Sequence, residues 1–259
     1  MKDELGDRMK RYEALVNPRL LEGLPVLARL DGRSFHAFAH NAERPFDPVL
    51  QTLMARTTRH LVVESCADVG YTQSDEITLA WLSVPFFDGN PQKMCSTLAA
   101  MCSVYFNLQD DLKSDRFRWI RMPTFDCRAW AVPSVSEAAN VFLWRQQDAT
   151  RNSVQMAARA VFSHAACDGL DTKQLQEKLF AERGVNWNDY PPASKRGTFV
   201  RHVKTTRAFT AEELADLPPL HDARKNPDAV VERRSLVTLD VDLRSMSHDE
   251  RIAALFEDR

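Results

Sequence analysis

Two acidic segments carry the residues best suited to metal-assisted chemistry. Asp31 directly follows an apolar run, and the pair Asp75-Glu76 follows Tyr71-Thr-Gln-Ser74. Two carboxylates held a few ångströms apart can bind divalent cations, which stabilise the attacking and leaving oxygens of a phosphoryl transfer. A lone Asp-Gly dipeptide is more often a turn. Together the two segments predict a two-metal site formed by Asp31 and Asp75, with Glu76 pointing to the opposite face.

Groups that could bind phosphate surround the first aspartate. The segment Gly32-Arg33-Ser34-Phe35-His36 joins a predicted strand to a predicted helix, where main-chain N–H groups, a hydroxyl and a cation can hold a triphosphate. Cationic side chains that could also bind the triphosphate are Arg29, Arg44 and Lys93. Phe35 and His36 could contact a base, although a core phenylalanine beside a surface histidine is the simpler interpretation.

The hydrophobic pattern predicts the elements that must position these residues. Its period of two in the first strand places Arg29 and Asp31 on one face. Asp47 and Pro48 suit the N-cap and first position of a helix. The predicted order is strand, helix, strand, strand, helix, strand: Leu24–Leu30, a helix from Pro48, Val69–Gln73, Ile77–Val84, a helix from Pro91, and Phe125–Val132. This order predicts an α+β, ferredoxin-like (βαββαβ) palm with one sheet face free for a ligand.

The rest of the chain is expected to form an extension. Ser134 and Glu137 match a capping box that begins a helical region through about Cys167. A helix over Asp171–Arg183 and a strand over Gly197–Lys204 follow, and the Pro-rich, charged tail predicts loops. We therefore divide the chain into a catalytic core, residues 1–133, and a helical and strand extension, residues 134–259, that packs on the core.

Two polar groups in this extension could contact RNA. The block Trp144–Ser153 contains side chains that suit phosphate and sugar: Arg145, Gln146, Gln147, Arg151 and Asn152. The second group is basic and lies near the last predicted strand: Lys195, Arg196, Arg201, His202, Lys204 and Arg207. From composition alone, we favour an exposed helix face for the first group and an ordinary solvated surface for the second.

Composition places the chain among soluble globular proteins. Apolar residues make up 44% and charged residues 27% of 259 residues, with a formal net charge of -2. The five cysteines lack the spacing of a zinc site, which favours reduced thiols in a cytoplasm. Without a signal sequence or a long apolar run, we expect a cytoplasmic protein with no membrane contact.

Several of these segments together resemble the tRNA-histidine guanylyltransferase family, enzymes that add nucleotides to RNA 5′ ends in the 3′-to-5′ direction. The matching segments span most of the first 200 residues in the family order: Arg29–His36, Gln73–Glu76, Phe125–Ala129, Trp144–Ser153 and Lys195–Thr198. The resemblance implies two Mg2+ ions bound by Asp31, the Gly32 carbonyl and Asp75, with Glu76 as a helper.

The resemblance also implies substrates and assembly. ATP or GTP would activate the tRNA 5′ end, and nucleoside triphosphates would then be added. The phosphates and base of the incoming nucleotide would contact Arg33–His36 and Ser74. Arg29, Arg44 and Lys93 would bind the triphosphate. The segment from Lys195 would lie near tRNA, and a homotetramer is expected. Thr150-Arg-Asn-Ser153 stands where strict tRNA-histidine enzymes carry a His-Ile-Asn-Asn type sequence, which implies template-dependent repair of truncated tRNAs.

Two other functions fit the same order of elements. A palm-type nucleotidyl cyclase shares the two-metal chemistry but needs no tRNA surface, so the Trp144–Ser153 block argues against it. A non-catalytic RNA-binding module of the RRM type stacks bases on sheet aromatics, and Phe125–Trp130 lacks the expected Gly-Phe pattern. We rank the polymerase first, the cyclase second and the binding module third.

Overall fold

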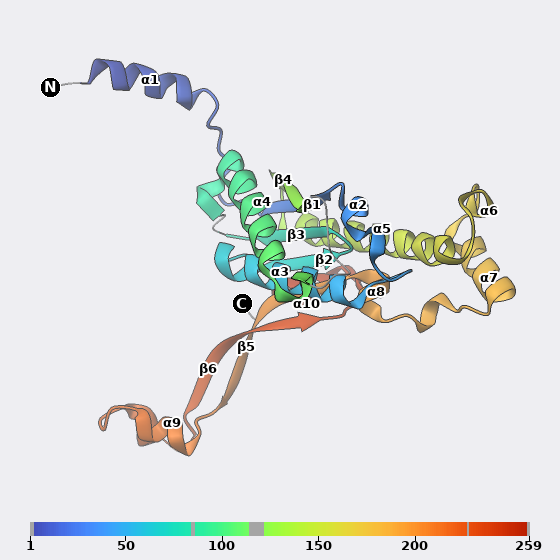
Figure 1. The fold of residues 1–259 in the computed structure, drawn as a ribbon. Helices are drawn as coiled ribbons and strands as arrows, with labels where there is room; N and C mark the ends of the chain where they lie inside the picture. The colour runs from blue at the N-terminus through green and yellow to red at the C-terminus, as the bar shows by residue number, and fades with distance from the viewer. Residues whose placement is uncertain (1–2, 84–85, 114–121, 227, 258–259) are drawn as a thin grey trace.

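The computed structural model describes residues 3–83, 86–113, 122–226 and 228–257. Within these residues a six-stranded antiparallel sheet has the order β4-β1-β3-β2-β5-β6 (Figure 1). Its strands are β1 (Val26–Arg33), β2 (Val69–Gln73), β3 (Glu76–Trp81), β4 (Thr124–Ala131), β5 (Thr198–Ala208) and β6 (Val230–Leu239). The first four strands have the ferredoxin-like order, so the predicted fold class is confirmed. Strand β3 ends before Val84, which lies outside the described residues.

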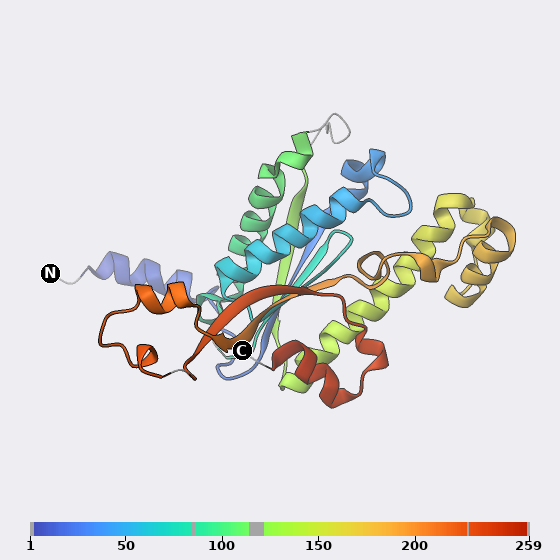
Figure 2. The same cartoon turned by 90° about the horizontal axis from the view of Figure 1, so that it is seen from below.

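Two antiparallel helices cover one face of the sheet. They are α3 (Pro48–Ser65) and α4 (Pro91–Leu108), which lie side by side in Figure 2. As the sequence predicts, Asp47 caps α3 by accepting hydrogen bonds from the N–H groups of Val49 and Leu50. Every second residue of β1 from Val26 to Leu30 is buried against these helices. The core on this face fixes the register of β1, and therefore the face on which Asp31 lies.

The second face of the sheet is also covered, which corrects the expectation of a free face. Helix α5 (Val135–Val161) and helix α10 (His248–Phe256) lie there, opposite α3 and α4 (Figure 2). Phe142 of α5 and Phe256 of α10 pack on Leu27 and Tyr71. Because Leu27 of β1 and Val69 and Tyr71 of β2 are buried apolar residues on this second face, it also needs a covering layer.

The C-terminal part contains more regular structure than its composition suggests. Strands β5 and β6 pair along ten residues of each strand and continue the sheet beyond β2. The expectation of loops in the tail is therefore wrong for β6 and α10, although the Pro-rich stretch beyond α9 (Ala211–Asp216) is irregular. The outer ends of β5 and β6 project from the body with α9 (Figure 1). Because the sheet crosses residue 133, the proposed division of the chain remains a prediction.

The remaining helices lie at the edges of the fold. Helix α1 (Glu4–Ala14) projects at the N-terminal end, and α2 (Phe35–Phe38) follows β1 (Figure 1). The outer half of α5 packs against α6 (His164–Cys167), α7 (Thr172–Arg183) and α8 (Pro192–Arg196) around a separate apolar cluster. The predicted capping residue of α7, Asp171, forms a complete capping box with Gln174. No helix in the described part of the chain has the length and apolar character needed to cross a bilayer.

Candidate active site

The structure brings the two predicted metal-binding segments into contact. The N–H of Gly32 donates to the carbonyl of Asp75 at 3.1 Å, and Asp31 lies opposite Glu76 in the sheet. A Cβ atom built on Gly32 would lie 2.9 Å from Oδ2 of Asp75. The Asp75 carboxylate therefore lies directly over Gly32, beside Asp31, although the two segments are distant in the sequence. This convergence gives two carboxylates and a main-chain carbonyl in one place.

The hairpin between β2 and β3 fixes the direction of the Asp75 side chain. Its turn consists of Ser74 and Asp75, and Ser74 adopts a left-handed φ of 54°. The hydroxyl of Ser74 donates to Oδ1 of Asp75 at 3.0 Å. Ser34, at the end of the neighbouring loop, is also left-handed with a φ of 52°. Non-glycine residues keep this conformation only where the surrounding structure enforces it, so both turns have defined shapes.

The electrostatics of this pair suit a divalent cation. Burial raises the pKa of Asp75, and the negative charge of Asp31 raises it further, while hydrogen bonds from the Asp75 main chain and Ser74 lower it. Among the described residues, neither carboxylate forms an ion pair with an Arg or Lys side chain. No cluster of three or more His, Cys, Asp or Glu side chains in the described part forms a metal site. A site with two carboxylates, a carbonyl and water fits Mg2+, which binds few protein ligands.

Glu76 points away from Asp75 and toward α5, on the face of the sheet that it shares with Asp31. Arg145 of α5 donates to both carboxylate oxygens of Glu76, at 2.6 and 2.8 Å, and also to Asp148 at 2.9 Å. Burial raises the pKa of Glu76, and the hydrogen bonds and charge of Arg145 oppose this change. Arg29 is 3.9 Å from the same carboxylate. The expectation that Glu76 faces away from Asp75 agrees with the structure, and Glu76 holds α5 on the sheet.

Two residues expected to contact RNA are buried by this packing. Arg145 is 9% exposed and Gln146 is fully buried. Gln146 accepts a hydrogen bond from the N–H of Leu243 at 2.7 Å and donates to the carbonyl of Val241 at 2.8 Å. The structure therefore corrects the expectation of direct RNA contact for both residues: their polar groups join α5 to the sheet and to the C-terminal segment.

The other predicted RNA residues divide between interior and surface. Lys195 is 7% exposed, donates to the carbonyl of Asn188 at 2.5 Å and lies over the Trp187 ring, so it too is corrected to a structural role. Burial, followed by the charge of Arg196, lowers the pKa of Lys195. Arg196 lies 3.5 Å from Asp242. Arg151 and Asn152, on the outer face of α5, are exposed, and so are Gln147, Lys204 and Arg207.

The loop after β1 separates into buried and exposed positions. Phe35 is 7% exposed and packs against Phe38, Phe106 and Phe125. It also lines the cavity beside the hairpin, so its contact with a base stays a prediction. Arg33, Ser34 and His36 are exposed beside Gly32. These three side chains remain available to a ligand.

Within one chain, Lys93 lies far from Gly32 and the loop after β1. It lies in the first turn of α4, whereas Phe106, near the end of the same helix, packs on Phe35. At a rise of 1.5 Å per residue, Lys93 is about 20 Å along the helix from that contact. The structure therefore separates Lys93 from Asp31 and Asp75.

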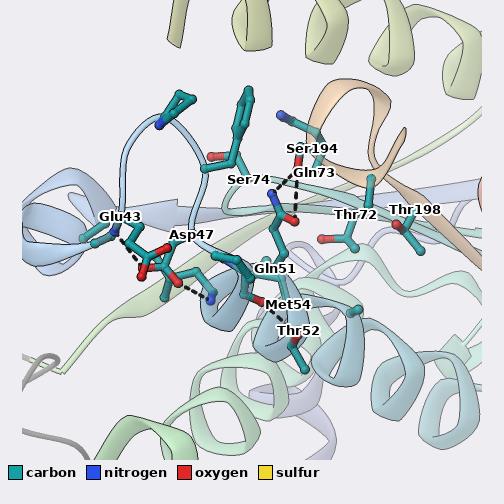
Figure 3. A pocket seen from close by; sticks show the side chains of 18 of the residues that line it. Glu43, Asp47, Gln51, Thr52, Met54, Thr72, Gln73, Ser74, Ser194 and Thr198 are labelled. Atoms are coloured by element: carbon teal, nitrogen blue, oxygen red, sulfur yellow. Dashed lines mark hydrogen bonds between the residues drawn. The ribbon is translucent and has the colours of Figure 1, made fainter. Parts of the chain in front are cut away.

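A cavity of ≈ 520 Å³ lies beside the hairpin turn. Figure 3 shows Ser74 and Gln73 on one side, with Gln51 of α3 donating to Ser194 of α8 at 2.9 Å. Arg44 also lines the cavity, as does Asp47, which accepts from the N–H of Glu43 at 2.8 Å. Sequence reasoning identified Arg44 and Ser74 but missed Gln51 and Ser194, because isolated polar residues on two distant helices give no sequence signal.

A ferredoxin-like sheet with paired carboxylates at adjacent strand ends and a cavity beside them defines a palm of the nucleotidyltransferase class. The sequence model of the Thg1 family, tRNAHis guanylyltransferase, matches residues 6–133. The chain belongs to this family.

Solved structures and a curated relative support that assignment. A bacterial tRNA(His) guanylyltransferase (Thg1)-like protein in complex with ATP is 37% identical, with a TM-score of 0.70 over 76% of this chain and 88% of its own. Another such structure, in complex with GTP, is 32% identical, with a TM-score of 0.66 over 90% and 91%. The tRNA(His) guanylyltransferase of Debaryomyces hansenii is 28% identical over 73% of this chain and 77% of its own length.

Proposed function

We propose that this protein adds nucleotides to the 5′ end of tRNA in the 3′-to-5′ direction. The observation that carries the proposal is the contact of Asp31, Gly32 and Asp75, which places two unpaired carboxylates and a carbonyl at one end of the palm. These oxygens would hold two Mg2+ ions. The family and the nucleotide complexes of similar proteins support the same function.

The reaction has two parts in this proposal. ATP or GTP first transfers its nucleotidyl group to a tRNA 5′-monophosphate and releases pyrophosphate. The 3′-hydroxyl of an incoming nucleoside triphosphate then attacks the activated 5′-phosphate and releases AMP or GMP. A tRNA that already carries a 5′-triphosphate needs no activation. Bound magnesium would lower the pKa of the attacking hydroxyl and neutralise phosphate charge. Asp31 and Asp75 hold the metal site, and the Ser74 hydroxyl keeps the Asp75 carboxylate in one orientation.

The cavity beside the hairpin is the proposed nucleotide site. Its ≈ 520 Å³ and mixed walls suit a nucleoside, and Ser74 connects it directly to Asp75. Arg44, an exposed cation on its rim, can pair with phosphate. The names of two similar structures include ATP and GTP, which supports either nucleotide as a ligand here.

The RNA is expected to lie along the outer face of α5, where Arg151 and Asn152 are exposed. Thr150-Arg-Asn-Ser153 differs from the sequence that strict tRNA-histidine enzymes carry, which favours repair of 5′-truncated tRNAs. Base pairing with the opposite strand of the acceptor stem would then select each incoming nucleotide. No protein contact to the base edge is required.

Assembly and compartment are part of the same proposal. Helix α1 carries an exposed apolar stripe at heptad spacing, formed by Leu5, Met9 and Tyr12 with Val16 just beyond the helix. Such a stripe supports subunit contacts in the expected homotetramer. All five cysteines are free thiols, which supports a reducing compartment such as the cytoplasm.

Incorporation of labelled nucleotides tests the proposal. The enzyme is given Mg2+, ATP and two 5′-monophosphorylated RNAs: full-length tRNA-histidine and a non-histidine tRNA without its first nucleotide. Faster extension of the truncated tRNA establishes repair, and preference for tRNA-histidine establishes guanylylation. Extension of neither RNA, together with tight tRNA binding, would refute the proposal and leave a binding module; failure to bind tRNA would favour a cyclase.

A further inference from the structure

A pair of polar side chains joins α3 to α8 at the cavity beside the hairpin. The hydroxyl oxygen of Ser194 lies 2.9 Å from Nε2 of Gln51 and 3.3 Å from Oε1 of the same amide. Both side chains lie in the wall of the cavity that the hairpin residues Gln73 and Ser74 also line (Figure 3). The cavity therefore has an amide and a hydroxyl beside the end that reaches the metal site.

The hydroxyl of this pair is held in a fixed position. Ser194 is 4% exposed. The main-chain carbonyls of the two residues that follow it accept hydrogen bonds from the hydroxyls of Ser153 and Tyr71, at 3.1 and 2.7 Å. These bonds fasten α8 to α5 and β2, so Ser194 gives the amide of Gln51 a rigid partner.

The amide of Gln51 keeps hydrogen-bonding capacity for a ligand. A primary amide has two N–H donors and an oxygen with two acceptor positions, and the contact with Ser194 uses a part of them. Neighbouring hydroxyls in the cavity wall differ, because those of Thr52 and Thr72 donate to main-chain carbonyls at 2.8 and 2.9 Å. Gln51 is therefore suited to contact a ligand edge in the cavity.

Ser194 allows this amide two orientations. A hydroxyl can donate or accept, so it satisfies either amide atom after the amide turns over and its oxygen and nitrogen exchange places. One orientation offers an acceptor to a ligand on a given side, and the other offers a donor. The pair can thus adapt to ligands whose hydrogen-bonding groups are reversed.

Adenine and guanine are such ligands. Adenine carries an amino donor at C6, where guanine carries a carbonyl acceptor, and N1 is likewise an acceptor in adenine and a donor in guanine. In the proposed reaction, the incoming nucleotide pairs with the tRNA, which occupies its Watson–Crick edge. The activating nucleotide has no template, so its edge is free for a protein contact.

We propose that Gln51, oriented by Ser194, contacts the Watson–Crick edge of the activating purine nucleotide, and that its two orientations let one site accept ATP and GTP. This inference rests on the proposed function, which places a nucleotide in the cavity, and it adds a specificity-determining residue. The phosphates would lie toward Asp75, and the base would lie between α3 and α8.

Gln51→Glu tests the assignment through a change in specificity. A carboxylate has nearly the same shape and still accepts from Ser194, but it offers acceptors alone. Contact with the C6 group then favours ATP, and contact with the N1 and N2 donors favours GTP. Calorimetry with each nucleotide and Mg2+, without RNA, should show the ratio of the two affinities changed by about tenfold to hundredfold, as for a charged hydrogen bond gained or lost.

Activity separates the activating nucleotide from the incoming one. The rate at which a tRNA 5′-monophosphate is activated by ATP or GTP should change in the same ratio in Gln51→Glu. Extension of a tRNA that already carries a 5′-triphosphate should keep the wild-type rate, because it needs no activation. An equal loss with both RNAs would overturn the assignment to the activating nucleotide.

Three further variants complete the test, with thermal unfolding as the check of each fold. Gln174→Glu makes the same change on α7, where glutamate also suits the capping box, and should keep the wild-type ratio. Ser194→Ala leaves the amide without its partner and should weaken ATP and GTP by similar factors. Gln51→Met removes the contact to either base, and it decides the matter if Gln51→Glu does not fold.

An affinity ratio in Gln51→Glu within about threefold of that in Gln174→Glu would overturn the role of Gln51 and leave the proposed function intact. Unchanged affinities for both nucleotides in Gln51→Met would do the same. Wild-type protein that binds nucleotides but extends no RNA would refute the polymerase, whereas the affinity ratio still decides whether Gln51 contacts the base. Wild-type protein that binds neither nucleotide would overturn both proposals.

Discussion

Gly32 and Asp75 touch through both main chain and side chain. The N–H of Gly32 donates to the carbonyl of Asp75, and the missing Cβ of Gly32 leaves the space that the Asp75 carboxylate occupies. The φ of Gly32 is not in the left-handed range, so glycine is needed for space rather than for backbone conformation. The Asp75 carboxylate can therefore occupy its position only because residue 32, in β1, has no side chain.

Gly32→Ala is expected to remove activity more strongly than stability. The new Cβ would lie 2.7 Å from Cδ2 of Phe35 and 2.9 Å from Oδ2 of Asp75, so the carboxylate must move. We expect at least about a hundredfold loss of nucleotide addition, because a 1 Å displacement can have that effect, and about 1–3 kcal/mol loss of unfolding free energy. Initial rates and urea unfolding measure both.

The control for this substitution is Gly70→Ala in β2. Its Cβ would meet the side chains of Val62 and Thr58 at 2.6 and 2.8 Å, in the core and away from the carboxylates. It should lose similar stability and keep its activity below its melting temperature. Equal activity losses in the two variants would show that Gly32 acts through stability alone.

Asp75→Asn is expected to stabilise the metal-free protein and to abolish activity. Because the folded-state pKa of Asp75 is raised, its ionised form destabilises the fold, and this cost increases as pH rises through that pKa. At pH 7 in EDTA, the melting temperature of Asp75→Asn should therefore be higher than that of the wild type. Nucleotide addition with Mg2+ should fall at least about a hundredfold. Retained activity in both Asp75→Asn and Asp31→Asn would contradict the metal assignment.

Arg145→Met is expected to cost stability, because the buried Glu76 carboxylate loses both hydrogen bonds and keeps only Arg29, 3.9 Å away, as a counter-charge. The two side chains are 10% and 16% exposed. Breaking such a pair typically costs about 3–5 kcal/mol, and removing both charges costs less. Urea unfolding of Arg145→Met, Glu76→Gln and the double variant should therefore show partial recovery in the double variant. Unchanged stability with weakened tRNA binding would instead return Arg145 to the RNA surface.

Arg151→Met is expected to weaken tRNA binding in a salt-dependent way. The side chain is 58% exposed on the outer face of α5, although it also pairs with Asp148 at 2.6 Å. Loss of one phosphate contact should reduce the slope of log affinity against log salt by about 0.7–0.9. Arg8→Met on α1 is the control and should keep the full slope. The same slope in both variants would remove Arg151 from the interface.

Acid is expected to release α9 from β5 and β6. Glu213 accepts from Arg207 at 2.6 and 2.7 Å and from Arg233 at 2.6 Å. Hydrogen bonds from Arg207, followed by the N–H of Thr210, lower its pKa from 4.5 to about 2. The stabilising contribution is therefore complete above about pH 4.5 and is lost as the pH falls toward 2. Amide NMR signals of α9 should change over this range, and Glu213→Gln should show the acid form at pH 7. A Glu213→Gln spectrum identical to wild type would contradict this contact.

The sequence predicted the parts of the fold that local chemistry determines. Asp47 and Pro48 begin α3 because one caps and the other suits the first turn, and the alternation in β1 fixed the face of Asp31. The burial of residues in the polar block of α5 was harder to predict, because Arg145 and Gln146 are polar yet buried. Their partners, Glu76 and Leu243, are distant in sequence, and nothing local distinguishes such residues from an exposed face.

Other differences between the predictions and the structure arise from strand pairing and from the distance between elements. Strand β6 contains Glu232, Arg233 and Arg234, a composition typical of a loop, and it forms because β5 offers a complete set of hydrogen-bond partners. Lys93 has the right charge, but the position of α4 removes it from the site. Asp126 lies opposite Asp31 only through the register of β4 with β1, which no local pattern specifies.

At the hairpin between β2 and β3, three consecutive side chains contact three different parts of the structure. Ser74 lines the cavity, Asp75 lies over Gly32, and Glu76 holds α5 through Arg145. A ligand that moves one of these residues must move its neighbours, because the turn is too short to absorb the change. Occupancy of the cavity and of the outer face of α5 would then be thermodynamically linked, and such coupling is reciprocal: nucleotide changes RNA affinity by the same factor by which RNA changes nucleotide affinity.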